Sequence, residues 1–307
     1  MISRTVYIGN PASLYLRRGQ MVIEPEEEPA VVPHRKKPTP PSVPIEDLGY
    51  LIIDEPQVTV SHALLAELVK NNVVVVSCDE RHMPTGLLLP LEGHTLQQER
   101  YRNQLRATEP LKKQLWKQTI ECKIWNQARM LQWIKEPNGD RLMKMAPQVK
   151  SGDAGNMEAR AAVIYWETIM ADWDIRDRFG EPPNNMLNYG YAVLRATMAR
   201  ALVTSGLLCT VGIHHRNRYN AYCLADDIME PYRPMVDKTV WALCARHEDL
   251  PENLSWEHKS ELLSMHQMDV SIGGKARPLM VAVSETAASL AKCFDGTAKK
   301  IQYPLLV

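Results

Sequence analysis

The chain has 307 residues, enough to bury a substantial core and to form one large domain or two ordinary ones. Lysine plus arginine and aspartate plus glutamate are equal at 36 each, so the formal net charge is zero. A neutral chain lacks the overall electrostatic signature of a nucleic-acid-binding protein, and this balance alone counts against DNA as a ligand.

Six cysteines occur singly, never as a C-x-x-C pair, at positions 78, 122, 209, 223, 244 and 293. This spacing is typical of reduced core residues and favours a reducing compartment over a disulfide framework. The first residues lack the basic start and long apolar run of a signal peptide, and no apolar segment approaches the ~20 residues that span a bilayer. We therefore expect a soluble cytoplasmic protein without membrane association.

The first part of the chain, residues 1–92, predicts a small β-sheet domain. Short β-branched runs separated by turn residues dominate residues 5–62. Ser61 is a suitable N-cap for a helix that continues through Leu68, and the run VVVVSCD over residues 73–79 is typical of a buried strand. We expect these strands and this single helix to form one unit.

A Pro-rich segment interrupts this pattern between Glu24 and Pro44. It holds seven of the 21 prolines, together with an acidic cluster and a basic one. Proline cannot donate a hydrogen bond to a sheet ladder and the charges disfavour a core, so no packed strand is expected there. We expect a mobile insertion in a hairpin, and the alternative is a segment that binds a partner.

Residues 93–307 change to a helical pattern punctuated by prolines. Apolar residues recur at helical spacing over residues 111–131, and a second strong helix is expected over residues 185–205, with Gly206 at its C-cap. The sequence therefore predicts an α+β chain, in which a small N-terminal β-sheet domain is followed by a larger all-α domain.

The most informative stretch is GIHHRNRYNAYCLADDIMEPYRP, residues 212–234, in which two adjacent histidines precede three carboxylates. On a helix, Asp227 and Glu230 stand three apart and Asp226 and Glu230 four apart, so either pair can face one cavity. Two carboxylates and one imidazole suit a hard divalent ion. Because no thiolate is offered at ligand spacing, the pattern favours Mg²⁺ or Mn²⁺ over structural zinc.

Each of these residues also has an ordinary structural explanation. The histidines suit core or surface positions, and the aspartates can begin a helix. Glu158, a further candidate from the separate segment GDAGNMEARAAVIYWETIMADW, is favoured in a first helical turn by the helix dipole. Their combination carries the prediction, because Pro231 disfavours α geometry at Glu230 and should end or kink the helix there. Adjacent histidines and aspartates also suit a metal-dependent nucleotide phosphohydrolase, which is one alternative function.

Segments along nearly the whole chain resemble the CRISPR-associated integrase of the adaptation module, the first Cas protein, in its type II form. In chain order they are RTVYIGN, LLAELVKNNVVVVSCDERHMPTGLLLPL, LNYGYAVLRATMARAL, SGLLCTVGIHHRNRYNAYCLADDIMEPYRP and IQYPLLV. The most specific parts of this likeness are NYGYA and DDIMEPYRP.

The resemblance implies a helical catalytic domain and a metal-dependent endonuclease and integrase of CRISPR adaptation. Such proteins join the 3′-hydroxyl ends of short foreign DNA, the spacers, into the repeat array by transesterification. The family's metal ligands fall on Glu158, His215 and Glu230, with Asp227 as a further catalytic acid and Mg²⁺ or Mn²⁺ as the cofactor. His214 is then the neighbour of the ligand. A non-catalytic nucleic-acid-binding scaffold that retains the site is the second alternative.

The resemblance also implies partners in a prokaryotic cytoplasm. They are double-stranded DNA, as captured fragment and as CRISPR repeat, and the small second Cas protein. Two homodimers of the chain would flank one dimer of that protein, giving a heterohexamer. Other type II adaptation proteins and the RNA-guided effector nuclease are further candidate partners.

A neutral protein must concentrate its cations to contact phosphates. The candidate DNA-binding residues are Arg81, His82, Arg216 and Arg218. A basic helical face over residues 97–123 is a further candidate, and its alternative is a solvated amphipathic helix.

Three other arginines are expected to pair with anions. Arg195 and Arg200, on the 185–205 helix, each need a carboxylate or a phosphate if they are buried. Arg233 follows three acids closely and is expected to brace them.

Overall fold

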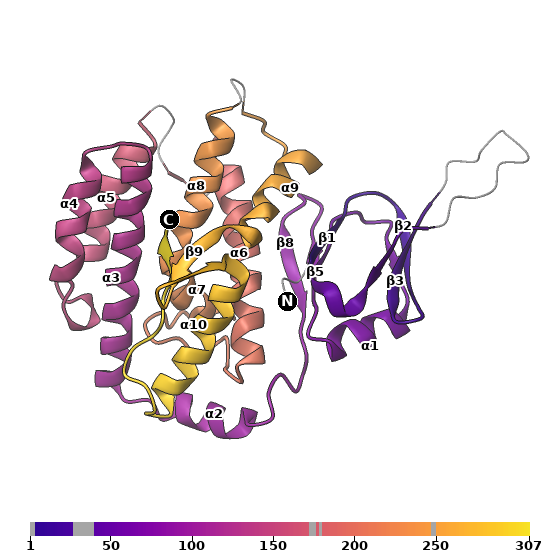
Figure 1. Ribbon diagram of the computed structural model, residues 1–307, viewed down its shortest axis with the longest axis horizontal. Helices are drawn as coiled ribbons and strands as arrows, with labels where there is room; N and C mark the ends of the chain where they lie inside the picture. Colours follow the sequence, from indigo (N-terminus) through magenta and orange to yellow (C-terminus); the bar gives the residue numbers. More distant parts are fainter. Residues whose placement is uncertain (1–3, 27–39, 172–175, 178–179, 247–249) are drawn as a thin grey trace, which may run out of the picture. The chain divides into compact units, whose positions relative to one another are not determined.

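The computed structural model describes every residue except 1–3, 27–39, 172–175, 178–179 and 247–249. The chain divides into two compact units, residues 1–93 and 94–307 (Figure 1). Strands dominate the first unit and helices the second, which confirms the predicted α+β class. No helix within the described ranges is both long and apolar enough to cross a membrane.

The N-terminal unit contains two four-stranded sheets among its described residues. The first, in the order β1-β5-β7-β8, consists of β1 (Arg4–Ile8), β5 (Leu48–Ile53), β7 (Val74–Cys78) and β8 (Pro84–Leu88). The second, in the order β4-β3-β2-β6, consists of β4 (Ser42–Pro44), β3 (Gln20–Pro25), β2 (Ala12–Arg17) and β6 (Thr59–Val60). The 3₁₀ turn η1 (Ile45–Asp47) and the helix α1 (His62–Lys70) complete the unit.

The first sheet is parallel across β1, β5 and β7, and β8 adds to it antiparallel to β7. Helix α1 begins where expected, because the Ser61 side chain accepts a hydrogen bond from the Leu64 backbone N–H at 3.4 Å. Its Leu64 and Leu68 are buried in one apolar cluster with Leu14 of β2 and Leu51 of β5. The N-cap and apolar spacing thus predict this helix correctly.

The Pro-rich segment does interrupt a hairpin, since β3 and β4 pair antiparallel on either side of it, with Val22 opposite Ser42. The expectation that no strand forms between Glu24 and Pro44 is wrong at both ends, where β3 reaches Pro25 and β4 ends at Pro44. Strand β4 lies at the edge of its sheet, where proline is tolerated. Residues 27–39, the centre of the expected mobile insertion, lie outside the described residues.

The C-terminal unit is mainly helical. Its described α-helices are α2 (Gln97–Leu105), α3 (Glu109–Trp133), α4 (Asn138–Met145), α5 (Met157–Ile169), α6 (Asn184–Thr204), α7 (Cys223–Met229), α8 (Arg233–Cys244), α9 (Trp256–Ser264) and α10 (Leu279–Phe294). Its 3₁₀ turns are η2 (Ala146–Gln148), η3 (Ser151–Asp153), η4 (Glu230–Tyr232) and η5 (Met265–Gln267).

The unit is not all-α, because it also holds a small antiparallel sheet in the order β10-β9-β11. Its strands are β9 (Asp269–Ile272), β10 (Lys275–Pro278) and β11 (Leu305–Leu306). Strands of two to four residues are too short to show the alternating pattern that predicts a strand. The third strand also depends on a partner more than 30 positions away in the sequence.

Helix α6 approaches α8 closely at Gly190, within the NYGYA motif. A Cβ at position 190 would lie 2.4 Å from Cγ1 of Val236, a separation that real side chains do not show. Glycine at this position therefore sets the packing of α8, which directly follows the acidic segment. Gly206 ends α6 with a φ of +66°, as its C-cap position predicts.

Candidate metal centre

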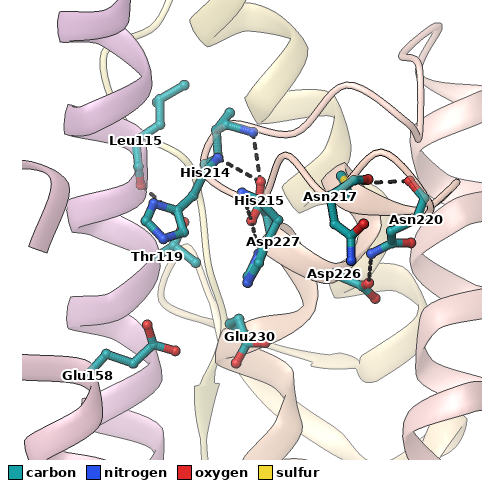
Figure 2. Close-up of polar contacts among 12 residues, drawn as sticks. Leu115, Thr119, Glu158, His214, His215, Asn217, Asn220, Asp226, Asp227 and Glu230 are labelled. Atoms are coloured by element: carbon teal, nitrogen blue, oxygen red, sulfur yellow. Dashed lines mark hydrogen bonds and ion pairs between the residues drawn. The ribbon is translucent and has the colours of Figure 1, made fainter. Parts of the chain in front are cut away.

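The histidine pair lies in the loop before α7 and is held there by Asp227. The Asp227 carboxylate accepts backbone N–H groups from Ile213 at 2.7 Å, His214 at 2.9 Å and His215 at 3.1 Å (Figure 2). It also contacts Nδ1 of His215 at 2.5 Å, and its exposed fraction is 0%. Both oxygens are therefore engaged, and Asp227 fixes the loop and the orientation of the His215 ring.

Gly212, the first residue of the motif, makes this turn possible. A Cβ there would lie 2.5 Å from the backbone oxygen of His215 and 2.7 Å from Oδ2 of Asp227. Any larger residue would displace either the loop or the carboxylate that holds it. Glycine at position 212 is thus a packing requirement of the site.

Trp116 of α3 separates the roles of the two histidines. Its ring stacks on His214, with centroids 4.1 Å apart and an interplanar angle of 1°, and meets the His215 ring edge-on at 5.7 Å. Burial lowers the pKa of His214, whereas the hydrogen bond that His215 donates to Asp227 raises the pKa of His215. With Nδ1 of His215 bound to Asp227, its Nε2 is the nitrogen left for a metal ion. The arrangement favours His215 over His214 as the ligand.

Glu158 and Glu230 come together from separate elements around one cation. Nζ of Lys123, on α3, lies 2.6 Å from Oε1 of Glu158 and 2.6 Å from Oε2 of Glu230. The two carboxylate oxygens are thus at most twice that distance apart, and Figure 2 shows the carboxylates facing one another. Glu158 stands in the first turn of α5, which is capped by Asp153 through the backbone N–H groups of Met157 at 2.9 Å and Glu158 at 3.0 Å.

The charges of this cluster are maintained by one another. Burial by itself would raise the pKa of Glu230, but the cations of Arg233 and Lys123 outweigh it and hold the pKa at about 2. Burial would likewise lower the pKa of Lys123, and Glu230 and Glu158 raise it instead. Arg233 donates Nε–H to Oε1 of Glu230 at 2.8 Å, which confirms that it braces an acid of the motif.

The four predicted site residues form two pairs, His215 with Asp227 and Glu158 with Glu230. Within the described ranges, no three His, Cys, Asp or Glu side chains are gathered as a metal site. The donor set nevertheless fits a hard divalent ion, because Oε2 of Glu230 is a buried carboxylate oxygen that accepts no hydrogen bond from the described residues and forms an ion pair with Lys123 at 2.6 Å. Glu158, His215 and Glu230 are the residues that would hold Mg²⁺ or Mn²⁺, with Lys123 at the position between the carboxylates.

Asp226 faces away from this site. Its carboxylate accepts hydrogen bonds from Nε and Nη2 of Arg195 at 2.6 and 3.1 Å and from Nδ2 of Asn220 at 2.7 Å. The partner of Arg195 is therefore a carboxylate. Of the two pairs that helical spacing allowed, Asp226 with Glu230 does not form, because Arg195 and Asn220 engage the Asp226 carboxylate.

The bend expected at Pro231 is found in part. Helix α7 ends at Met229 and the chain continues through the 3₁₀ turn η4 into α8. Glu230 itself keeps helical dihedral angles, with φ −51° and ψ −45°, so the expectation that the following proline would remove it from α geometry is wrong. The 3₁₀ turn accommodates the proline at the junction of the two helices.

The candidate DNA-binding residues occupy exposed positions in both units. Arg216 pairs with Glu109 at 2.6 Å, and the Arg218 guanidinium lies 4.5 Å from the centre of the Tyr219 ring. In the N-terminal unit, Arg81 and His82 follow β7, and Nδ1 of His82 lies 3.0 Å from Oδ1 of Asp54. DNA binding by these residues stays a prediction.

The basic stretch over residues 97–123 is not one continuous face. It is divided between α2 and α3, and Arg100 donates to the backbone oxygen of Ser205 at 2.7 Å. Lys123 turns inward to the carboxylates. Its place on α3 accounts for this, because Ile120 and Gln127, three before and four after it on the same helical face, are both buried in the structure.

Three comparisons relate the chain to known proteins. Residues 6–269 match the family described as CRISPR associated protein Cas1. A CRISPR-associated endonuclease Cas1 of Neisseria meningitidis serogroup C is 33% identical over 310 residues, covering 99% of this chain and 96% of that protein.

Two solved structures share the fold. A casposase bound to an integration product has a TM-score of 0.76 at 22% identity, covering 98% of this chain and 92% of that chain. A Cas6-RT-Cas1–Cas2 complex has a TM-score of 0.71 at 17% identity, covering 97% of this chain and 35% of that chain.

Proposed function

The chain belongs to the Cas1 family of CRISPR-associated proteins, and on that basis we propose that it is a metal-dependent DNA endonuclease and integrase of CRISPR adaptation. It would join the 3′-hydroxyl ends of short foreign DNA into the repeat array. The observation that supports this most directly is the gathering of Glu158 and Glu230 around one cation, beside a His215 ring whose Nδ1 is already engaged.

A divalent ion held by Glu158, His215 and Glu230 would polarise the scissile phosphate and favour loss of the proton from the attacking 3′-hydroxyl. In the exchange, the 3′-oxygen of the captured fragment forms a new P–O bond. A P–O bond of the repeat strand breaks, and its oxygen leaves as a hydroxyl after it takes up a proton. Phosphoryl transfer needs little covalent chemistry from the protein, so we propose no serine, cysteine or tyrosine nucleophile.

The chain's own residues position the reacting groups. Asp227 keeps the proton of His215 on Nδ1 and so leaves Nε2 free to act as a ligand. Because both Asp227 oxygens are engaged in the loop, we assign it a positioning role in place of the direct acid–base role considered from the sequence. Arg233 keeps Glu230 ionised.

The proposed partners are double-stranded DNA, a second copy of this chain and the small second Cas protein. A structural neighbour is bound to an integration product, and another belongs to a complex that contains Cas2, which supports both kinds of partner. We propose the heterohexamer of two dimers of this chain around one partner dimer, and sedimentation with and without the small partner tests it. A monomer under both conditions would contradict the assembly.

A strand-transfer assay tests the activity. Supercoiled repeat DNA, a short duplex fragment, the small Cas partner and Mg²⁺ or Mn²⁺ should give joined products with the parent protein. We expect these products to be lost with Glu158→Ala and with His215→Ala. Glu167→Ala, an exposed glutamate on the same helix as Glu158, is the matched control and should join DNA normally. Normal joining by Glu158→Ala and His215→Ala would refute the metal centre.

The same assay distinguishes the two alternative functions. A non-catalytic scaffold would bind the duplex fragment without giving joined products. A nucleotide phosphohydrolase would release phosphate from free nucleotides and give no strand transfer. No observation in the structure favours either alternative over integration.

A further inference from the structure

Lys123 is the least expected member of the metal centre. Its side chain is only 12% exposed, and its ammonium bridges the same two carboxylates that would hold a divalent ion. A buried lysine is costly to desolvate unless its charge is compensated, and here Glu158 and Glu230 compensate it. The lysine thus neutralises a carboxylate pair that would otherwise repel.

A divalent ion and the ammonium cannot both occupy this position. Mg²⁺ binds carboxylate oxygens at about 2.0–2.1 Å, and the ammonium already lies 2.6 Å from one oxygen of each glutamate. Arg233 supplies a further positive charge on the other oxygen of Glu230. An ion that entered while Lys123 stayed in place would meet two neighbouring cations in a buried site. The lysine therefore has to move for the ion to bind.

The structure also offers a second position for the ammonium. Lys123 lines a cavity of about 240 Å³ together with Gln127, Arg233 and Asp237. Gln127 stands four residues after Lys123 on α3 and so lies on the same helical face. Its Oε1 is buried and accepts no hydrogen bond from any described residue. A lysine released from the glutamates can therefore find an acceptor one helical turn away.

We infer that Lys123 is a built-in counter-ion with two positions, bridging Glu158 and Glu230 in the metal-free protein and turning toward Gln127 Oε1 when a divalent ion binds. This inference rests on the proposed metal centre. It assigns Lys123 a regulatory role, because the work of displacing the ammonium lowers the affinity for the ion.

Calorimetric titration with Mn²⁺ alone, without DNA or a partner protein, tests this inference. Lys123→Met removes the competing charge and should bind Mn²⁺ roughly tenfold more tightly than the parent, or better. Gln127→Leu removes the second position and should weaken binding several-fold. Lys117→Met, on the same helix about 9 Å earlier, is the matched control and should keep the parental affinity.

A structural role for Lys123 alone would give a different result, because the loss of a merely structural residue weakens metal binding. Lys123→Arg keeps a cation between the glutamates and should bind Mn²⁺ no more tightly than the parent. Thermal unfolding in EDTA should show Lys123→Met destabilised, and saturating Mn²⁺ should restore it to the metal-bound parent. Recovery of thermal stability in saturating Mn²⁺ can be measured even if Lys123→Met is partly unfolded in EDTA.

The outcomes separate this inference from the proposed function. If the parent binds Mn²⁺ and Lys123→Met binds it equally or less tightly, the counter-ion role is overturned while the metal centre stands. If neither protein binds Mn²⁺, the metal centre itself is overturned, and the counter-ion role with it. Binding by Lys123→Met that exceeds parental binding supports the inference.

Discussion

Asp227 offers the sharpest test of how the site is organised, through Asp227→Asn. The substitution keeps the size of the side chain and replaces one oxygen by an NH₂ group, which cannot accept a hydrogen bond. Oδ2 of Asp227 now accepts two backbone N–H groups, from Ile213 and His214, and Oδ1 accepts the N–H of His215 and contacts its Nδ1. The amide oxygen can take only one of these two places.

The costs of the two orientations differ. With the amide oxygen at the Oδ1 place, two buried backbone donors lose their acceptor, at about 1–3 kcal/mol each. With the amide oxygen at the Oδ2 place, only the N–H of His215 loses its acceptor, for about 1–3 kcal/mol. In that cheaper orientation the NH₂ group faces Nδ1 of His215, which must then be the unprotonated nitrogen. The proton moves to Nε2, the nitrogen needed by the ion.

We therefore expect Asp227→Asn to lose about 1–3 kcal/mol of unfolding free energy and roughly 10–100-fold in Mn²⁺ affinity. Urea unfolding in EDTA measures the first quantity and calorimetric titration the second. Asp226→Asn is the matched control for affinity, because Asp226 faces Arg195 and Asn220 on the other side of α7. The reasoning is refuted if Asp227→Asn keeps parental affinity, or if Asp226→Asn weakens the binding of Mn²⁺ equally.

Three further predictions follow from the same geometry. Gly212→Ala should lower the free energy of unfolding by about 1–3 kcal/mol through overpacking and weaken Mn²⁺ binding, because its Cβ would contact the His215 backbone and Asp227 too closely. Unchanged Mn²⁺ affinity would contradict this prediction. The pKa of Glu230 is lowered to about 2 from an ordinary 4.5, so its ionisation stabilises the metal-free protein above pH 4.5, and this contribution is lost as pH falls toward 2. Between pH 4.5 and 2, the free energy of unfolding measured in urea should fall by about 3 kcal/mol more in the parent than in Glu230→Gln. Equal pH dependence in the two proteins would exclude the pairing of Glu230 with Lys123 and Arg233. Arg216→Ala should change the free energy of unfolding by less than ~1 kcal/mol, since its pair with Glu109 is exposed. The same variant should bind DNA more weakly, and the slope of log affinity against log salt concentration should fall by about 1. Glu109→Ala should raise DNA affinity, and if neither variant changes DNA binding, Arg216 is not a DNA contact.

The sequence predicts correctly those helices whose caps and apolar spacing lie within a few residues of one another. The Ser61 cap and the apolar spacing after it predict α1, and Gly206 marks the end of α6. The small sheet of β9, β10 and β11 is not predicted, because its strands have only two to four residues and β11 pairs with a strand more than 30 positions away. The all-α expectation for the second unit failed for that reason.

The sequence by itself determined which residue types the site contains. Two carboxylates and an imidazole, with no thiolate at ligand spacing, favour a hard ion whatever the fold, and NYGYA and DDIMEPYRP carry the most specific family resemblance. Asp226 and Asp227 are chemically identical neighbours, so composition could not decide between them. Only the packing of α7 turned Asp227 to the histidine loop and Asp226 to Arg195.

Tertiary structure likewise decided how the carboxylates are held. Glu158 and Glu230 stand 72 positions apart in the sequence, and only the packing of α5 and η4 against α3 brings both to Lys123. The sequence pattern places this lysine on a basic helical face, since a charge is normally solvated. Burial reverses that expectation, because a lysine enclosed beside two carboxylates is stabilised by them and becomes part of the site.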